Sequence, residues 1–176
     1  GGWNAPNRKD TIEKFSLVSD ADATDVGNLA ATRYSMMTQC SDTHGYASAG
    51  YVGSASGSNV IEKFSFTVDG DATNVGVVTV ARYGGSGQSS STHGYSTGGY
   101  QAGFKNQIDK FTFASDADAT DVGDITVATY NNAGQNSTTH GYNTGGDAST
   151  DVIEKFTLAA DANATDVGNL SVARAS

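Results

Sequence analysis

One sequence pattern occurs four times along the chain, and this repeat constrains the fold more than any other feature. The copies begin at Ile12, Ile61, Ile108 and Ile153, and each opens with IEKF or IDKF. Successive copies start 49, 47 and 45 residues apart, a period typical of the blades of β-propellers. An acidic turn such as SDADATDVG follows each copy, then a strand ending in Ala-Arg or a close variant. A THGY segment follows in three of the four copies; it ends in Ala-Gly after the first copy and in Gly-Gly after the second and third.

Each unit reads as about four short strands, which predicts an all-β fold. IEKFSF is β-branched and aromatic, with Phe64 and Phe66 on one face of the expected strand, and VGVVTVAR is the next strand. The acidic stretch between them predicts a turn, because Asp and Asn cap their own backbone. The THGY segment holds almost nothing a core would bury, so we expect an inner strand held by hydroxyl hydrogen bonds and small side chains.

The order of these elements resembles a kelch repeat, in which a strand ending in a Gly doublet precedes a strand with an aromatic residue, a hairpin and a strand ending near Arg. The counterparts here are Gly98-Gly99, Phe111, the turn 116–121, and Arg82 or Arg174. The tryptophan usual after the hairpin is replaced by the DVG stretch. The motif order DKF…ATDVG…AR…GQSSSTHGY…GG most resembles that of the Gly/Ser-rich kelch-like repeat proteins predicted in marine bacteriophages. The resemblance implies a β-propeller and a place in a virion.

The sequence therefore predicts one repeat domain over residues 1–176, a kelch-like propeller of four blades with about four antiparallel strands each. Four IEKF copies but only three THGY copies leave an incomplete seam. Alternatively, the chain is a fragment of a longer array, or a neighbouring chain supplies the missing strands. The expected repeat units run approximately over residues 1–46, 47–95, 96–142 and 143–176.

Charge and composition exclude several classes of protein. The formal net charge of −9 repels phosphate backbones, so nucleic acid is not an expected partner. No apolar run approaches the length of a membrane span, so we expect no membrane insertion. Cys40 is the single cysteine, which rules out a disulfide within the chain.

Three features suggest chemistry but have simpler structural explanations. His44, His93 and His140 recur once per repeat; converging imidazoles can bind zinc or nickel, yet each ring can equally hydrogen-bond within its own blade. Two acidic turns space their oxygens as calcium loops do, but they lack the bidentate Glu and the glycine of such loops, and Asx-capped hairpins explain them as well. The weak calcium candidates are Asp20, Asp22, Asp25, Asp116, Asp118 and Asp121.

The remaining charged residues predict a structural role. Adjacent strand residues point to opposite faces, so Glu13 and Lys14, and their equivalents in the other copies, do not pair with each other. Arg33, Arg82 and Arg174 are the expected partners of the acids, between strands or blades. No nucleophile–base pair and no phosphate-binding loop stand out, so we expect no enzyme and no cofactor.

The variable loops carry the candidate binding residues. The distance from the Arg or Thr that ends a strand to the next His is constant, whereas the segment from the Gly doublet to the next Ile varies in length and content. Loops that vary on a constant scaffold commonly carry recognition, and exposed aromatics beside polar groups suit sugar rings and protein hot spots. The candidates are Trp3, Arg8, Lys9, Tyr51, Tyr100, Phe104 and Lys105.

The function expected from the sequence is non-enzymatic recognition. The concrete hypothesis is an extracellular or virion-surface module, such as part of a tail fibre, that contacts a host glycan or protein. The alternative is a structural or assembly protein whose open strand edges pair with neighbouring copies or other virion proteins.

Overall fold

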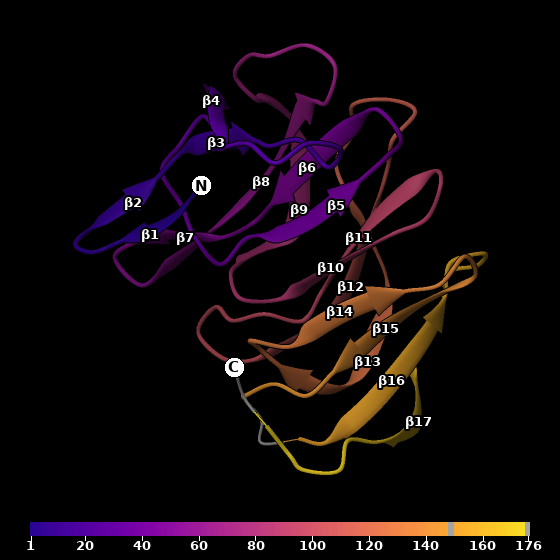
Figure 1. Cartoon of the computed structure of the whole chain (residues 1–176). Coiled ribbons are helices and arrows are strands. Elements are labelled where there is room, and N and C mark those ends of the chain that lie inside the picture. The colour runs from indigo at the N-terminus through magenta and orange to yellow at the C-terminus, as the bar shows by residue number, and fades with distance from the viewer. Residues whose placement is uncertain (148–149, 175–176) are drawn as a thin grey trace.

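The structure, a computed structural model, describes residues 1–147 and 150–174 and contains only β-strands and connecting segments there (Figure 1). The strands form five small antiparallel sheets, which confirms the all-β prediction. The strands are β1 (Gly2–Asn4), β2 (Asn7–Lys9), β3 (Thr11–Lys14), β4 (Thr24–Asn28), β5 (Met37–Cys40), β6 (His44–Ser48), β7 (Tyr51–Gly53), β8 (Ser56–Ser65), β9 (Thr73–Arg82), β10 (Ser86–Ser89), β11 (His93–Thr97), β12 (Lys105–Thr112), β13 (Thr120–Thr129), β14 (Ala133–Asn136), β15 (His140–Thr144), β16 (Val152–Thr157) and β17 (Thr165–Asn169).

Three of the sheets repeat one strand order. They are β5-β6-β8-β9, with β7 as an extra partner of β8, then β10-β11-β12-β13 and β14-β15-β16-β17. The IEKF segment forms the third strand of each sheet and the DVG segment forms the fourth. The first copy supplies only these two strands, β3 and β4, and β1 and β2 form a separate hairpin before them. The prediction of four strands per unit is thus confirmed for three units.

The sheets succeed one another in chain order down Figure 1, from the indigo β3–β4 pair to the yellow β17. Within the described residues, no hydrogen-bonded ladder joins β3 or β4 to the sheet of β14–β17. The sheets are also phased differently from the expected repeat units. The expected boundaries at residues 46, 95 and 142 fall inside β6, β11 and β15, so each sheet begins before its THGY strand.

The polar THGY strand is the second strand of its sheet, and a still shorter strand lies at the inner edge. These inner strands, β5, β10 and β14, contact one another from sheet to sheet (Figure 1). Glutamines of the inner strands bond to the THGY strand of the next sheet: Gln39 Nε2 donates to Tyr95 O at 2.8 Å and to Ser96 Oγ at 3.0 Å in β11. Gln88 Nε2 donates to Tyr142 O at 3.0 Å in the next sheet. Hydrogen bonds thus run from an inner strand to the THGY strand of the next sheet. The expectation that the THGY segment is itself the innermost strand is wrong, because a shorter strand lies inside it.

Glycine in the THGY strand makes room for a phenylalanine on the neighbouring strand. A Cβ atom built on Gly94 would lie 2.4 Å from the Phe111 ring, and Gly45 and Gly141 stand in the same relation to Phe64 and Phe156. Phe111 is buried by this contact and by the preceding sheet. The apolar core consists of three such clusters along the row of sheets.

Two buried ion pairs link successive sheets, and they confirm the predicted role of Arg33 and Arg82. Arg33 pairs with Glu62, and Arg82 Nη1 lies 2.7 Å from Asp109 Oδ2; all four side chains are almost completely buried. The Arg82 guanidinium also donates to the carbonyl oxygens of three further residues, Gly98, Val80 and Ser96. Each arginine therefore joins one sheet to two strands of the next.

The third boundary has uncharged hydrogen-bond donors in place of the arginine. Thr129 occupies the arginine position, and the buried Glu154 instead accepts hydrogen bonds from Asn143 Nδ2 at 3.0 Å and from the Thr126 backbone N–H. Asn132, also buried, donates to Asn143. Loss of the arginine is thus accompanied by two asparagines that supply hydrogen-bond donors at the same boundary.

Candidate functional site: a row of aromatic rings

Seven aromatic side chains form a continuous row that crosses the boundaries between sheets. Successive ring centroids lie 5.3 Å apart for Trp3–Tyr34, 5.0 Å for Tyr34–Tyr51 and 5.0 Å for Tyr51–Tyr83. The row continues from Tyr83 to Tyr100 at 5.7 Å, from Tyr100 to Tyr130 at 5.6 Å, and from Tyr130 to Phe104 at 5.9 Å. All of these pairs are tilted, stacked or edge-on, the geometries that aromatic quadrupoles favour.

The row is built by one backbone contact that recurs at two of the boundaries. The residue after the arginine of one sheet pairs with the residue after Ala49-Gly50 or Gly98-Gly99 of the next. Tyr34 N–H donates to Tyr51 O at 3.3 Å and Tyr51 N–H to Tyr34 O at 2.8 Å, and Tyr83 and Tyr100 exchange the same two bonds. The chain turns sharply just before this contact: Gly98 has a φ of 64°, a left-handed conformation that glycine adopts without a Cβ penalty.

The two ends of the row are its most exposed parts. Trp3 is 53% exposed and Phe104 is 43% exposed, while the tyrosines between them are half-buried. The phenol hydroxyls give these rings polar ends beside apolar faces. The row thus offers several flat apolar surfaces edged with hydrogen-bonding groups.

Three cations lie next to the ends of the row. Arg8 is directly opposite Trp3 in the β1–β2 hairpin, and Lys9 is opposite Gly2. The Arg8 guanidinium also lies against Gly53, two residues beyond Tyr51, where a Cβ atom would be 3.0 Å from Nη1. Lys105 follows Phe104 at the start of β12. The structure therefore brings six of the seven candidate residues within or directly beside the row, with Lys9 one step further along the hairpin.

The environment of the row shifts two phenol pKa values. Desolvation raises the pKa of Tyr83, and the neighbouring tyrosines add to this effect. A hydrogen bond with the Asp147 carboxylate is the main cause that raises the pKa of Tyr130, followed by desolvation. Both phenols therefore remain protonated donors at neutral and mildly alkaline pH.

Sequence reasoning named Trp3, Tyr51, Tyr100 and Phe104 but missed the three tyrosines that link them. Tyr34, Tyr83 and Tyr130 each directly follow the Arg or Thr that ends a DVG strand. That constant position was the available signal. The fourth variable loop contains residues 148 and 149, which lie outside the described residues.

Each histidine is the first residue of its THGY strand and makes a local contact. The Nδ1 atoms of His44, His93 and His140 lie 2.8, 2.8 and 2.9 Å from the hydroxyl of the preceding threonine. Desolvation lowers the pKa of His93. In the part of the chain that the structure describes, no group of three or more His, Cys, Asp or Glu side chains is arranged to hold a metal ion.

The acidic turns act as hydrogen-bond acceptors between sheets. Asp71 Oδ1 accepts the Asn28 N–H at 2.8 Å, and Asp118 Oδ1 accepts the Val77 N–H at 3.1 Å. Asp116 pairs with Lys63 at 2.6 Å. Of the other calcium candidates, Asp25 and Asp121 accept the N–H of the glycine two residues on, and Asp20 and Asp22 are exposed.

The hollows in the surface are shallow and mostly lined by repeat elements. The most apolar one, of about 450 Å³, lies where the first sheet lacks its inner two strands, and is lined by side chains that include Phe15, Leu17, Phe64 and Phe66. Another hollow, of about 580 Å³, is lined entirely by polar residues: Asp42, Ser89, Ser90, Ser91, Asn136, Ser137 and Thr138.

No protein-family model matches this chain, and no curated protein is significantly similar to it. The described residues form no helix of the length and apolarity needed to cross a membrane.

Proposed function

We propose that the chain is a non-enzymatic recognition module with an open, kelch-like propeller arrangement, and that the aromatic row binds a glycan chain. The observation that carries this proposal is the row itself, seven rings in contact across three repeats. Sugar rings present apolar C–H faces and a rim of hydroxyls. Flat aromatic faces edged by phenols match both features.

The charges near the row refine the class of glycan. Arg8, Lys9 and Lys105 can donate hydrogen bonds to sugar hydroxyls. The net charge of −9 opposes the approach of polyanions, so a neutral oligosaccharide long enough to cover several rings is the expected ligand.

The place of action rests on the resemblance to kelch-like phage proteins. A module of this kind would act outside the cell or on a virion surface, where it contacts a host glycan. The kelch-like propeller arrangement is supported by three sheets of identical strand order that follow one another along the chain.

The test is a titration of the protein with a panel of neutral oligosaccharides, followed through tryptophan fluorescence. Trp3 is the only tryptophan, so its emission reports on one end of the row. We expect binding to change this emission for at least one oligosaccharide. Phe104→Ala, at the other end, should weaken that binding by about tenfold or more, because exposed aromatic anchors supply a large share of binding energy.

Phe66→Ala is the matched control, because Phe66 is exposed to nearly the same extent, 45%, but lies outside the row. It should leave affinity unchanged. Absence of binding to every member of the panel, or equal losses in Phe66→Ala and Phe104→Ala, would contradict the proposal.

A further inference from the structure

The three boundaries between successive sheets repeat one set of contacts. A backbone N–H in the acidic turn of each sheet donates to a carbonyl oxygen of the DVG strand in the sheet before it. The three bonds, each 2.8 Å long, are Ala72 N–H to Asn28 O, Ala119 N–H to Val77 O and Ala164 N–H to Asp124 O. The buried acid of the next sheet accepts a backbone N–H in return, as Asp109 does from Thr79 at 3.1 Å. This set of bonds fixes the position of one sheet on the next.

Charged side chains follow the same direction at each boundary. The lysine of one IEKF strand pairs with the first acid of the next acidic turn, as in Lys14–Asp69, Lys63–Asp116 and Lys110–Asp161. The arginine of one sheet pairs with the acid of the next, as in Arg33–Glu62 and Arg82–Asp109. The cation therefore always comes from the earlier sheet.

Apolar contacts also follow one direction, from the tyrosine of the earlier sheet to the phenylalanine of the later sheet. Tyr46 of the earlier sheet packs on Phe111 and Phe113 of the later one, with ring centroids 5.5 and 4.7 Å apart. Val75 and Val78 join the same cluster with Phe111. At the next boundary Tyr95 packs on Phe156 at 5.5 Å and donates to Leu158 O at 3.1 Å.

Among the described residues, no further sheet packs on the last one. The last sheet therefore exposes the residues that, at the internal boundaries, belong to the earlier of the two sheets. We call this surface the C-terminal face; its members are Tyr142, Lys155, Val167, Leu170 and Arg174. Val167 is 47% exposed, although its equivalent Val75 is only 8% exposed, and Arg174 is exposed, although Arg82 is fully buried. A Cβ atom on Gly168 would meet nothing within 4 Å, whereas one on Gly76 would lie 2.3 Å from Ala117 O of the next sheet.

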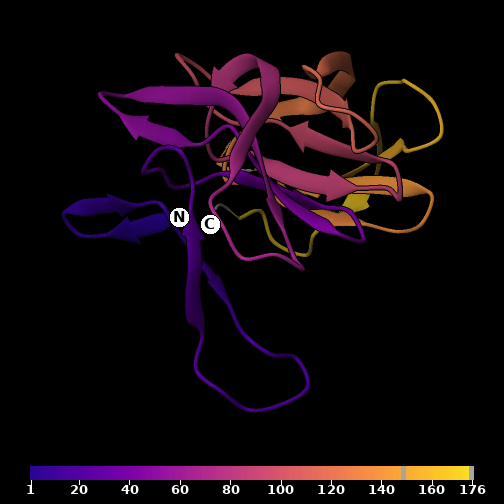
Figure 2. The same ribbon diagram turned by 90° about the horizontal axis from the view of Figure 1, so that it is seen from above.

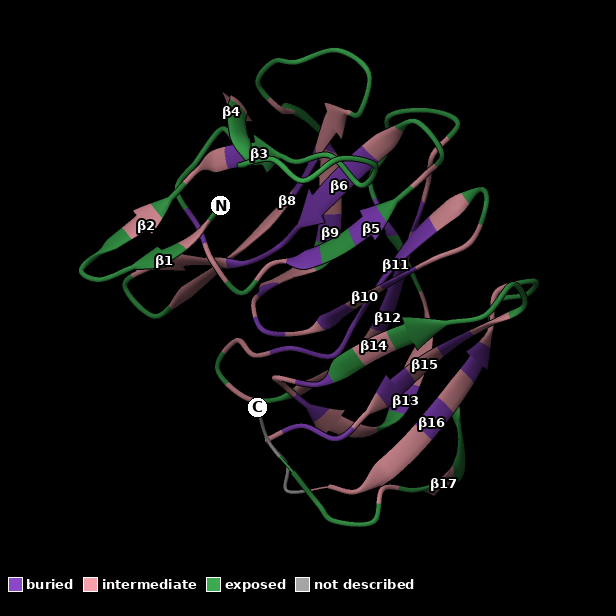
Figure 3. Cartoon of the chain, viewed as in Figure 1, coloured by how far each residue is buried: buried purple, intermediate pink, exposed green. Residues whose placement is uncertain are grey.

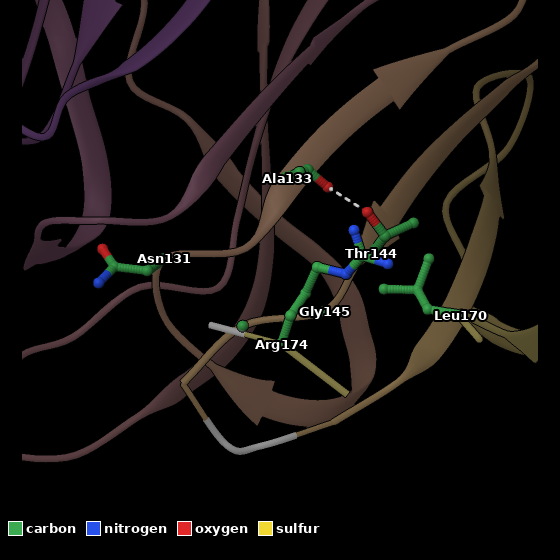
Figure 4. A pocket seen from close by; sticks show the side chains of 7 residues that line it. Asn131, Ala133, Thr144, Gly145, Leu170 and Arg174 are labelled. Atoms are coloured by element: carbon green, nitrogen blue, oxygen red, sulfur yellow. Dashed lines mark hydrogen bonds between the residues drawn. The ribbon is translucent and has the colours of Figure 1, made fainter. Parts of the chain in front are cut away.

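Figure 4 shows the inner part of the C-terminal face, where Arg174 and Leu170 lie beside Thr144 and Gly145. These residues line a shallow hollow of about 220 Å³. In the part of the chain described by the structure, Arg174 and Lys155 take part in no ion pair.

The first sheet exposes the residues that, at the internal boundaries, belong to the later of the two sheets. We call this surface the N-terminal face; its members are Glu13, Phe15, Leu17, Asp20 and Asp22. Phe15 is 63% exposed and Leu17 is 90% exposed, whereas the equivalent Phe111 is only 3% exposed. The segment projects from the body of the molecule (indigo in Figure 2), and Figure 3 shows the β3–β4 region largely exposed. Glu13 and Asp20 form none of the ion pairs found among the described residues.

From this complementarity we infer that the C-terminal face of one copy binds the N-terminal face of a second copy, head to tail. Arg174 would pair with the second copy's Glu13, and Lys155 with its Asp20. Tyr142, Val167 and Leu170 would cover Phe15 and Leu17. The inference goes beyond the proposed glycan-binding function and does not depend on it.

Charge and geometry both favour a second copy as the occupant. The two faces carry opposite charges at the positions that pair at the internal boundaries. A contact between two different faces of one molecule is heterologous, so each copy keeps one face open. The expected products are chains of copies, or a ring where the rotation from copy to copy closes.

The test measures the mass of particles in solution by light scattering during size-exclusion chromatography, over a range of protein concentrations at moderate salt. The wild-type chain should form oligomers larger than the 18.0 kDa monomer as concentration rises. Glu13→Arg and Arg174→Glu should each raise the dissociation constant by about 100-fold or more, because each places like charges opposite one another.

Mixing the two variants provides the decisive comparison. The intact Glu13 of the Arg174→Glu variant can still meet the intact Arg174 of the Glu13→Arg variant, so the mixture should recover association at concentrations where each variant alone is monomeric. Asp42→Lys is the control, because it makes the same change in net charge as Glu13→Arg at an exposed site outside both faces. It should associate like the wild type.

Circular dichroism should show that all variants keep the fold, since every substituted side chain is exposed. A wild-type chain that stays monomeric at every concentration would overturn the inference. Oligomers that neither Glu13→Arg nor Arg174→Glu weakens would overturn it too.

Discussion

Arg82→Met should lower the free energy of unfolding by about 3–5 kcal/mol, because it leaves a completely buried carboxylate without its cation. Asp109 lies in the interior, and the Arg82 guanidinium is its ion-pair partner. The substitution also leaves the carbonyl oxygens of Gly98 and Ser96 without these donors. Urea denaturation followed by circular dichroism measures the change.

Two further variants separate the buried charge from the loss of packing. Arg82→Met combined with Asp109→Leu removes both charges and should recover much of the lost stability. Lys63→Met breaks the more exposed pair with Asp116 and should cost no more than about 1 kcal/mol. Equal effects of Arg82→Met and Lys63→Met would show that burial does not govern the strength of these pairs.

Phe111→Ala should destabilise the protein by about 3–5 kcal/mol, since it removes a buried ring from the middle of the core. The ring packs between Gly94 of its own sheet and Tyr46 and Phe113 nearby. No small movement can fill the space, because the strands on both sides are fixed by hydrogen bonds. Chemical denaturation again gives the magnitude.

Phe15→Ala is the matched control for Phe111→Ala. Phe15 has the same place in the repeat, but its ring is 63% exposed because the first sheet lacks the glycine-bearing strand that would cover it. In an Arg174→Glu background, which keeps the chain monomeric under the association inferred above, Phe15→Ala should change stability by less than about 1 kcal/mol. A large effect of Phe15→Ala in that background would mean that the first sheet is covered in the monomer.

The repeat made most strands predictable, because the β-branched and aromatic residues of the IEKF and DVG strands are a local signal. The pairing of Arg33 and Arg82 with acids was also predictable, since arginine and an acid recur once per unit and a buried charge needs a partner. The position of the THGY strand was predicted only in part. It is the second strand of its sheet, because a shorter strand lies inside it and contacts the neighbouring sheet through Gln39 or Gln88.

The aromatic row shows where sequence reasoning ended. Tyr51 and Tyr100 follow Ala49-Gly50 and Gly98-Gly99 and were found, but their partners Tyr34 and Tyr83 belong to the preceding sheet. That contact depends on how one sheet packs on the next, which a repeat period does not encode. The same is true of Asn143, which donates to Glu154 at the boundary where the arginine is replaced by Thr129. Ring closure likewise depends on the rotation from sheet to sheet.

The hydrogen-bonded inner strands have a consequence for how stability varies with temperature. Serine, threonine, glutamine and paired charges occupy interior positions that aliphatic side chains fill in most domains, among them Ser48, Ser96, Thr97 and Gln88. Exposing apolar surface raises the heat capacity by about 0.45 cal/mol/K per Å², whereas exposing polar surface lowers it by about 0.26. The unfolding of this chain should therefore have a small heat-capacity change for its length. Its free energy of unfolding should therefore vary little with temperature. Cooling should lower that free energy less than it does for a protein with an aliphatic core.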